Sequence, residues 1–129
     1  MANILVTDDS SFLRRRTCNI LKAGGHHITE AVNGIECMYQ IEQDGPDVLF
    51  LDLVMPEMDG LAVLLALKEQ GHPLPVIVLT ADIQDTIRDQ CLQLGAVGFI
   101  NKPPKEDEVL NALDVALNKK GSACAKDVL

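Results

Sequence analysis

The sequence predicts an α/β fold, a doubly wound parallel sheet of five strands with five helices on its two faces. Short apolar runs alternate with longer segments of helical periodicity about five times along the 129 residues. This alternation is typical of parallel strands joined by crossover helices, which cover both faces of the sheet. With 47% apolar residues, the chain can also bury the core of one domain.

The expected strands are short and have apolar interiors. The run at 47–51 (DVLFL) is apolar after its first residue, which suits a strand buried on both faces of a parallel sheet. The five expected strands are residues 3–7, 28–32, 47–51, 75–79 and 96–100.

The expected helices have recognisable end signals. Asn33 is placed to cap the second helix, with Glu36 three residues later, and Gly95 closes the fourth. The last helix begins with three acidic residues and ends with two lysines, which matches the helix dipole. The expected helices are 11–23, 34–44, 61–70, 83–94 and 106–120, so residues 1–120 form the domain and 121–129 a short, frayed C-terminal tail.

Composition excludes several classes of function. A net charge of -8 argues against binding to nucleic acid, which depends on cations that neutralise phosphates. No apolar run is long enough to span a membrane and the start has no signal-peptide pattern, so we expect a cytoplasmic protein. The cysteines are widely spaced without a CxxC pair, as expected of reduced thiols rather than disulfides or a zinc site: Cys18, Cys37, Cys91 and Cys124.

Polar residues follow four of the expected strands. Asp8 and Asp9 come after the first strand, Asp52 after the third, Thr80 after the fourth and Lys102 soon after the fifth. The carboxyl ends of parallel strands share one edge of the sheet, where ligands of such folds bind. We therefore expect three carboxylates, one hydroxyl and one ammonium group to meet there.

These groups suit phosphoryl chemistry. Three clustered carboxylates must be protonated, bind a cation or pair with a base, and carboxylate oxygens are the ligands that Mg²⁺ prefers. An ammonium group and a hydroxyl can bind phosphate oxygens, and a carboxylate can form an aspartyl phosphate. Each residue alone has a simpler explanation: Asp8 or Asp9 as a helix cap, Asp52 in a turn, Thr80 as a strand end, Lys102 in solvent. Only their joint placement is specific.

With these residues in place, the chain resembles the response regulator receiver domains, the family of the chemotaxis response regulator. The resemblance extends from residue 3 to about 119. It rests on Asp8-Asp9-Ser10, the segment 52–60 (DLVMPEMDG), Thr80-Ala81 and Lys102-Pro103. It implies a flavodoxin-like strand order, 2-1-3-4-5.

The resemblance also implies roles for the site residues. Asp52 would accept the phosphoryl group, and Lys102 would pair with the acyl phosphate. The Lys102–Pro103 peptide bond would be cis. Mg²⁺ would be held by Asp8, Asp9, Asp52 and the backbone carbonyl of Val54.

A switch is implied as well. Thr80 would move toward the phosphoryl group, and Phe99 would move inward with it. This movement would alter the face formed by the fourth helix, fifth strand and fifth helix, where a downstream protein would bind. Phe99 lacks the hydroxyl of the Tyr frequent at this position, which argues against a flagellar motor partner.

Two positions of the family tune how water reaches the acyl phosphate. Here they are Val54 and Asp82. An apolar Val54 cannot orient water, so we expect slow to moderate self-dephosphorylation.

The predicted function is therefore a response regulator phosphorylated by a histidine kinase or a phosphotransfer protein. We expect a signalling switch rather than an enzyme, standing alone without an output domain, as a monomer or weak dimer. A phosphatase of the haloacid dehalogenase type would need a second Asp at Val54. A non-phosphorylated module of the same fold would not need all five polar residues. We expect Arg14, Arg15 and Arg16 to form a solvated face, with one or two of them near the acids.

Overall fold

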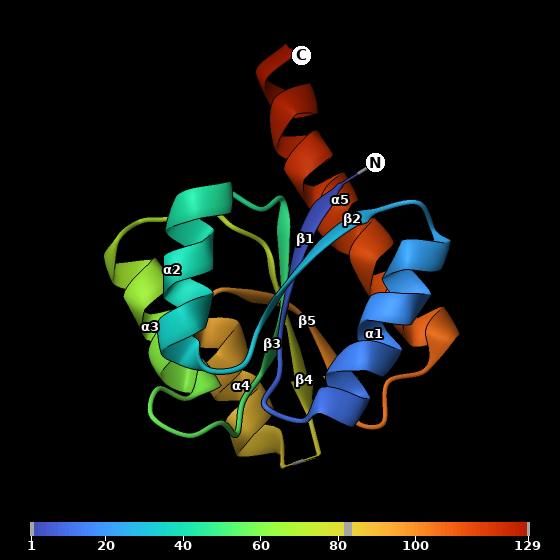
Figure 1. The fold of residues 1–129 in the computed structure, drawn as a ribbon. Coiled ribbons are helices and arrows are strands. Elements are labelled where there is room, and N and C mark those ends of the chain that lie inside the picture. Colours follow the sequence, from blue (N-terminus) through green and yellow to red (C-terminus); the bar gives the residue numbers. More distant parts are fainter. Residues whose placement is uncertain (1, 82–83, 129) are drawn as a thin grey trace.

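The computed structural model describes residues 2–81 and 84–128, with side chains described up to residue 118. Strands and helices alternate along these residues, as predicted (Figure 1). The strands are β1 (Asn3–Thr7), β2 (His27–Ala31), β3 (Val48–Asp52), β4 (Val76–Thr80) and β5 (Ala96–Asn101). The helices are α1 (Ser11–Ala23), α2 (Gly34–Asp44), α3 (Gly60–Glu69), α4 (Asp85–Gln93) and α5 (Glu106–Val128).

The strands form one parallel sheet in the order β2-β1-β3-β4-β5, which confirms the predicted fold class and strand order. β3 lies at the centre, between β1 and β4, and all five of its residues are buried. Asp52 is its last residue, so this carboxylate lies in the middle of the carboxyl edge of the sheet.

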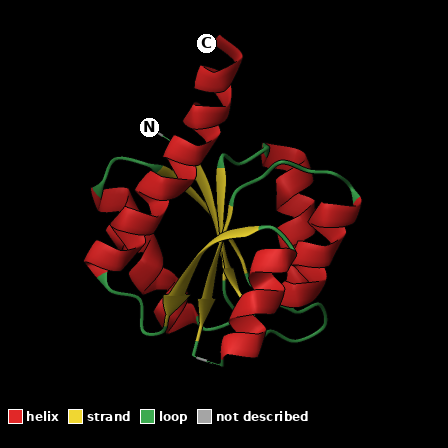
Figure 2. Cartoon of the chain, turned by 180° about the vertical axis from the view of Figure 1, so that it is seen from behind, coloured by secondary structure: helices red, strands yellow, loops and turns green. Residues whose placement is uncertain are grey.

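Two hydrophobic cores lie on the two faces of the sheet. Because side chains of a strand alternate between faces, Leu5 packs into one core while Ile4 and Val6 pack into the other. The first core contains residues of α2, α3 and α4, and the second contains residues of α1 and α5. Figures 1 and 2 show these two helical layers on opposite sides of the strands.

Most element boundaries agree with the sequence to within one residue. The side chain of Asn33 accepts a hydrogen bond from the backbone N–H of Glu36 at 2.8 Å, so the predicted cap is correct. The predicted start of the fourth helix, Ile83, lies outside the described residues, as does Asp82, and α4 is described from Asp85.

The predicted end of the last helix was wrong. α5 continues to Val128, whereas it was expected to end at Lys120 and to be followed by a frayed tail. Gly121 does not end the helix, since glycine inside a helix costs only about 1 kcal/mol. Among the described helices, none is both long and apolar enough to cross a membrane.

Candidate functional site

The polar residues predicted at the strand ends lie together at the carboxyl edge of the sheet. Asp8 directly follows β1, Asp52 ends β3, Thr80 ends β4, and Lys102 directly follows β5. These elements are parallel and hydrogen-bonded neighbours in the order β1-β3-β4-β5. The sheet therefore brings together residues that are up to 94 positions apart in the sequence, as between Asp8 and Lys102.

The Lys102 ammonium group bridges two buried carboxylates. Its Nζ lies 2.9 Å from Asp8 Oδ2 and 3.0 Å from Asp52 Oδ1. The side chain of Lys102 is 12% exposed, against 1% for Asp8 and 4% for Asp52. One positive charge therefore faces two negative charges in a place with little access to water, where charges interact strongly.

The acid–base behaviour of Asp52 reflects this imbalance. Burial and the negative charge of Asp8 raise the pKa of Asp52 from 3.8 to about 7, although Lys102 and the backbone N–H of Val54 oppose the rise. Burial alone would lower the pKa of Lys102. Its hydrogen bonds to Asp8 and Asp52 outweigh burial and leave the pKa of Lys102 raised.

The carboxylate cluster fits a bound divalent cation. Asp8, Asp9 and Asp52 each offer an oxygen, and these oxygens lie within 4.8 Å of one another. Asp8 Oδ2 is fully buried, and the partner that the described residues give it is the Lys102 ammonium group at 2.9 Å. A buried carboxylate oxygen with spare capacity, beside the exposed Asp9, matches the oxygen ligands and water access that Mg²⁺ needs.

The loop after β1 is fixed at several points. The backbone N–H of Asp8 donates to the carbonyl of Ala31 at 3.1 Å, and the N–H of Ser10 donates to Asp8 Oδ1 at 2.9 Å. The Ser10 hydroxyl accepts from the N–H of Leu13, which caps α1. The site acid and the start of the helix are thus parts of one hydrogen-bonded turn.

The loop after β3 contains Val54 and a strained position. Val54 is 75% exposed at the mouth of the site, and its N–H approaches Asp52 Oδ1 at 3.4 Å. Glu57 has a φ of 67°, in the left-handed region that is unfavourable for residues other than glycine. A residue with a side chain cannot replace Gly60, because its Cβ would clash with the backbone carbonyl oxygen of Asp52.

The two predicted switch residues occupy different environments. Thr80 is buried, and its backbone carbonyl accepts the N–H of Lys102 at 2.8 Å, next to a cis Lys102–Pro103 bond. Phe99 is half-buried on β5 and packs against the first core. The guanidinium of Arg88, on α4, lies 5.9 Å from the centre of the Phe99 ring, within range of a cation–π contact.

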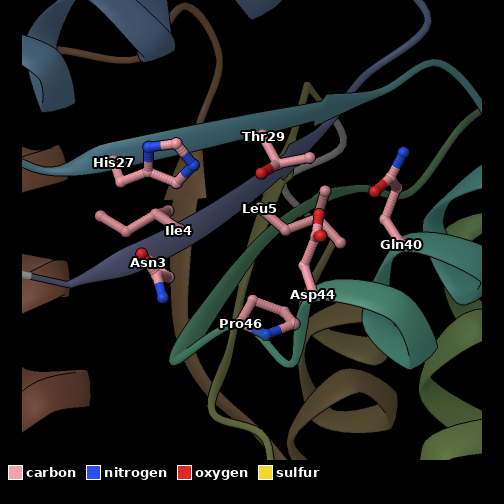
Figure 3. A pocket seen from close by; sticks show the side chains of 8 residues that line it. All are labelled: Asn3, Ile4, Leu5, His27, Thr29, Gln40, Asp44 and Pro46. Atoms are coloured by element: carbon pink, nitrogen blue, oxygen red, sulfur yellow. The ribbon is translucent and has the colours of Figure 1, made fainter.

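Among the hollows that the described residues form outside the carboxylate cluster, two differ in position and polarity. One, of about 180 Å³, lies at the amino ends of the strands, where His27 and Asp44 line it (Figure 3). The other, of about 220 Å³, is mostly apolar and adjoins the site between Val54, Leu61 and Ile87. Figure 3 shows that residues of β1, β2 and the end of α2, together with Pro46, line the first hollow.

Arg14 does not fit the expected solvated face, because it is half-buried, whereas Arg15 and Arg16 are exposed, as expected. Nη1 of Arg14 donates to the backbone carbonyl of Asp8, and Nε of Arg16 donates to the carbonyl of Pro104. The expectation that at least one arginine lies near the acids is correct for Arg14. Its carbonyl contact could not be recognised in the sequence, because backbone acceptors leave no residue pattern.

Comparison with known proteins agrees with this geometry. The family model described as response regulator receiver domain matches residues 4–114. Over 116 residues the chain is 35% identical to the chemotaxis protein CheY of Bacillus subtilis, covering 89% of this chain and 97% of that protein. NtrX from Brucella abortus is similar at a TM-score of 0.91 and 30% identity, over 99% of this chain and 29% of that one. A chain in the CheX–CheY–BeF3–Mg²⁺ complex from Borrelia burgdorferi has a TM-score of 0.82 and 31% identity, over 86% of this chain and 85% of that one.

Proposed function

This chain belongs to the response regulator receiver domain family of two-component systems, and we propose that it is a phosphorylation switch whose phosphoryl acceptor is Asp52. The observation that carries the proposal is the bridge of Lys102 between Asp8 and Asp52, at 2.9 and 3.0 Å. A central buried carboxylate with an adjacent ammonium group has the nucleophile and the counter-charge that an aspartyl phosphate requires.

The phosphoryl donor would be a histidine kinase or a phosphotransfer protein. A carboxylate oxygen of Asp52 forms a bond to the phosphorus of a phosphohistidine. The P–N bond breaks, and the ring nitrogen leaves with its electron pair. Lys102 then pairs with the phosphoryl oxygens instead of with the free carboxylate of Asp52.

Asp8, Asp9 and Asp52, with the carbonyl of Val54, would hold Mg²⁺. When bound, this ion neutralises charge on the donor and acceptor oxygens. The raised pKa of Asp52 is consistent with a need for added positive charge, since a nearby cation favours the ionised carboxylate that acts as nucleophile. The similar complex from Borrelia burgdorferi, which contains BeF3 and Mg²⁺, supports the same choice of ion.

The phosphoryl group would be reported through Thr80 and Phe99. Thr80 would turn toward it, Phe99 would move inward, and the face of α4, β5 and α5 would change for a downstream protein. The test is NMR of the protein with Mg²⁺ and BeF3⁻. We expect shifts at both residues, and unchanged signals for Thr80 and Phe99 on binding would contradict the switch.

Val54 bears on the lifetime of the phosphoryl group. Val54 stands at the mouth of the site with an apolar side chain that cannot orient water. We therefore propose slow to moderate self-dephosphorylation. A half-life of only seconds after removal of the donor would contradict this part of the proposal.

The acceptor is tested by intact-mass analysis after incubation with Mg²⁺ and acetyl phosphate. We expect one added phosphoryl group on the wild type and none on Asp52→Asn. Asp44→Asn, which alters an exposed acid at the opposite edge of the sheet, is the matched control and should be labelled like the wild type. Full labelling of Asp52→Asn would show that Asp52 is not the acceptor.

A further inference from the structure

We propose that Arg14 and Arg16 are positioning residues that fasten both loops of the phosphorylation site to helix α1. One loop carries Asp8 and the other carries Lys102. The inference rests on the proposed function, and it assigns a task to two residues that do not touch the phosphoryl group themselves.

Arg14 fastens the first loop. Its Nη1 donates to the backbone carbonyl of Asp8 at 2.8 Å, and its Nε pairs with Glu30 on β2 at 2.8 Å. The Arg14 side chain is 16% exposed and its bond to Asp8 is partly buried, whereas the Glu30 side chain is 46% exposed. Arg14 therefore links the Asp8 peptide to the helix α1 and to the edge strand β2.

Arg16 fastens the second loop. Its Nε donates to the carbonyl of Pro104 at 2.7 Å, across 88 positions of sequence. Pro104 is buried and lies two residues after Lys102. The loop that delivers the ammonium group is thus tied to the same helix as the loop that delivers Asp8.

The spacing of the two arginines explains how one helix serves both loops. Residues two apart in an α-helix point about 200° apart around its axis. Arg14 can therefore reach toward β2, while Arg16 reaches toward the loop before α5, and α1 packs beside α5 in the second core. Arg15, between them, is exposed and forms no hydrogen bond or ion pair with the residues that the structure describes.

The contacts of Arg14 and Arg16 should affect the chemistry of the site, because that chemistry depends on short distances between its groups. Lys102 Nζ lies within about 3 Å of both carboxylates only while the two loops keep their relative places. Removal of groups that orient metal ligands typically costs about 10-fold to 100-fold in metal affinity. The two arginines should therefore affect different steps, Arg14 the binding of Mg²⁺ and Arg16 the transfer of the phosphoryl group.

The experiment compares Arg14→Ala, Arg16→Ala and the control Arg15→Ala, each checked for folding by circular dichroism. Because the chain has no Trp, Mg²⁺ alone is titrated by calorimetry. Phosphorylation rates are then measured with acetyl phosphate at saturating Mg²⁺. We expect Arg14→Ala to weaken Mg²⁺ binding about tenfold, and Arg16→Ala to change it less than about twofold while lowering the maximal rate about tenfold.

Conservative variants separate positioning from general loss of structure. Lys can replace the single hydrogen bond of Arg16, so Arg16→Lys should recover most of the rate, whereas Arg14→Lys cannot make both contacts of Arg14 and should recover only part of the Mg²⁺ affinity. If Arg14→Ala does not fold, Glu30→Gln weakens the same anchor and should still lower Mg²⁺ affinity about twofold to threefold relative to Arg15→Ala.

The inference fails if Arg14→Ala and Arg16→Ala match Arg15→Ala within about twofold in both Mg²⁺ affinity and maximal rate. Such a result, with normal labelling of the wild type at Asp52, would leave the proposed function intact. Absence of labelling in the wild type would instead overturn the proposed function, and the Mg²⁺ titrations would still decide the role of Arg14.

Discussion

The two edges of the sheet are built from the same strands but differ in charge. At the carboxyl edge, two buried carboxylates face one buried ammonium group, and the pKa of Asp52 rises to about 7. At the amino edge, the hollow of Figure 3 is lined by exposed polar residues such as Asn3, His27 and Asp44.

The two edges also differ in backbone conformation. Turns at the amino edge use glycine wherever φ is positive: Gly25, Gly45, Gly71 and Gly95. At the carboxyl edge, the described residue with positive φ is Glu57, in the loop after Asp52. At the amino edge, the residues with positive φ are therefore glycines, which adopt it without strain. The carboxyl edge retains an unfavourable concentration of charge and one unfavourable backbone conformation. Such unfavourable features concentrate where a protein binds or reacts.

The largest expected difference between the edges concerns Lys102. Lys102→Met removes the charge between Asp8 and Asp52 and leaves the carboxylates to repel each other, which should lower the free energy of unfolding by about 3 kcal/mol at pH 8. Urea denaturation in EDTA measures it. Lys22→Met, which alters an exposed lysine at the other end of α1, should have little effect. Equal losses in both variants would show that the two edges do not differ in this respect.

Replacement of Asp52 should raise the free energy of unfolding instead of lowering it. Asp52→Asn removes one of the two carboxylates, and the variant should be more stable than the wild type in EDTA at pH 8. A rise of the pKa from 3.8 to about 7, at about 1.4 kcal/mol per unit, sets the upper limit, and about 2 kcal/mol is expected once screening is allowed for.

The pH dependence of this effect follows from the direction of the shift. A carboxyl group with a raised folded-state pKa contributes stability at low pH that is lost as the pH rises through the folded pKa. The wild type should therefore lose stability relative to Asp52→Asn between about pH 4 and pH 7. Denaturation curves across this range measure the difference, and Asp44→Asn should show none of it. A constant difference between the wild type and Asp52→Asn would contradict the assigned cause.

The smallest effect concerns the backbone. Glu57→Gly should stabilise the protein by about 0.5 to 1 kcal/mol, because glycine accepts a φ of 67° without strain. The mirror change at the amino edge, Gly45→Ala, should destabilise by a similar amount. A Cβ at Gly45 would meet no atom within 4 Å, so only its φ of 56° is at issue. Thermal melts of both variants measure the changes in stability. Changes of the same sign in the two variants would contradict the proposed difference between the edges.

The parts of the site that sequence could predict are those that follow from strand order. Asp8, Asp52, Thr80 and Lys102 come at or just after strand ends, and parallel strands bring such positions to one edge. Apolar runs and turn residues fix where strands end to within about one residue, which is enough to place a carboxylate at the edge of a sheet. Asp52 is the last residue of β3 instead of the first residue after it, and it still lies at the predicted carboxyl edge of the sheet.

Contacts between side chains and distant backbone could not be predicted in this way. The bond from Arg16 to Pro104 depends on how α1 lies against the loop before α5, and three adjacent arginines give no indication of which of them finds a carbonyl. The positive φ of Glu57 is similarly hidden, because glycine or asparagine is the usual sign of that conformation. Tertiary packing decides both features.

The assembly of the site from distant segments has a consequence for how a signal persists. Lys102 and Asp8 are neighbours only through the intact sheet, since β1 and β5 are joined by way of β3 and β4. Separation of any of these strands would disperse the groups that the proposed function assigns to the phosphorylation site. Under the proposed function, the thermal stability of the sheet would therefore set an upper limit on the temperature at which the protein keeps its phosphorylated state.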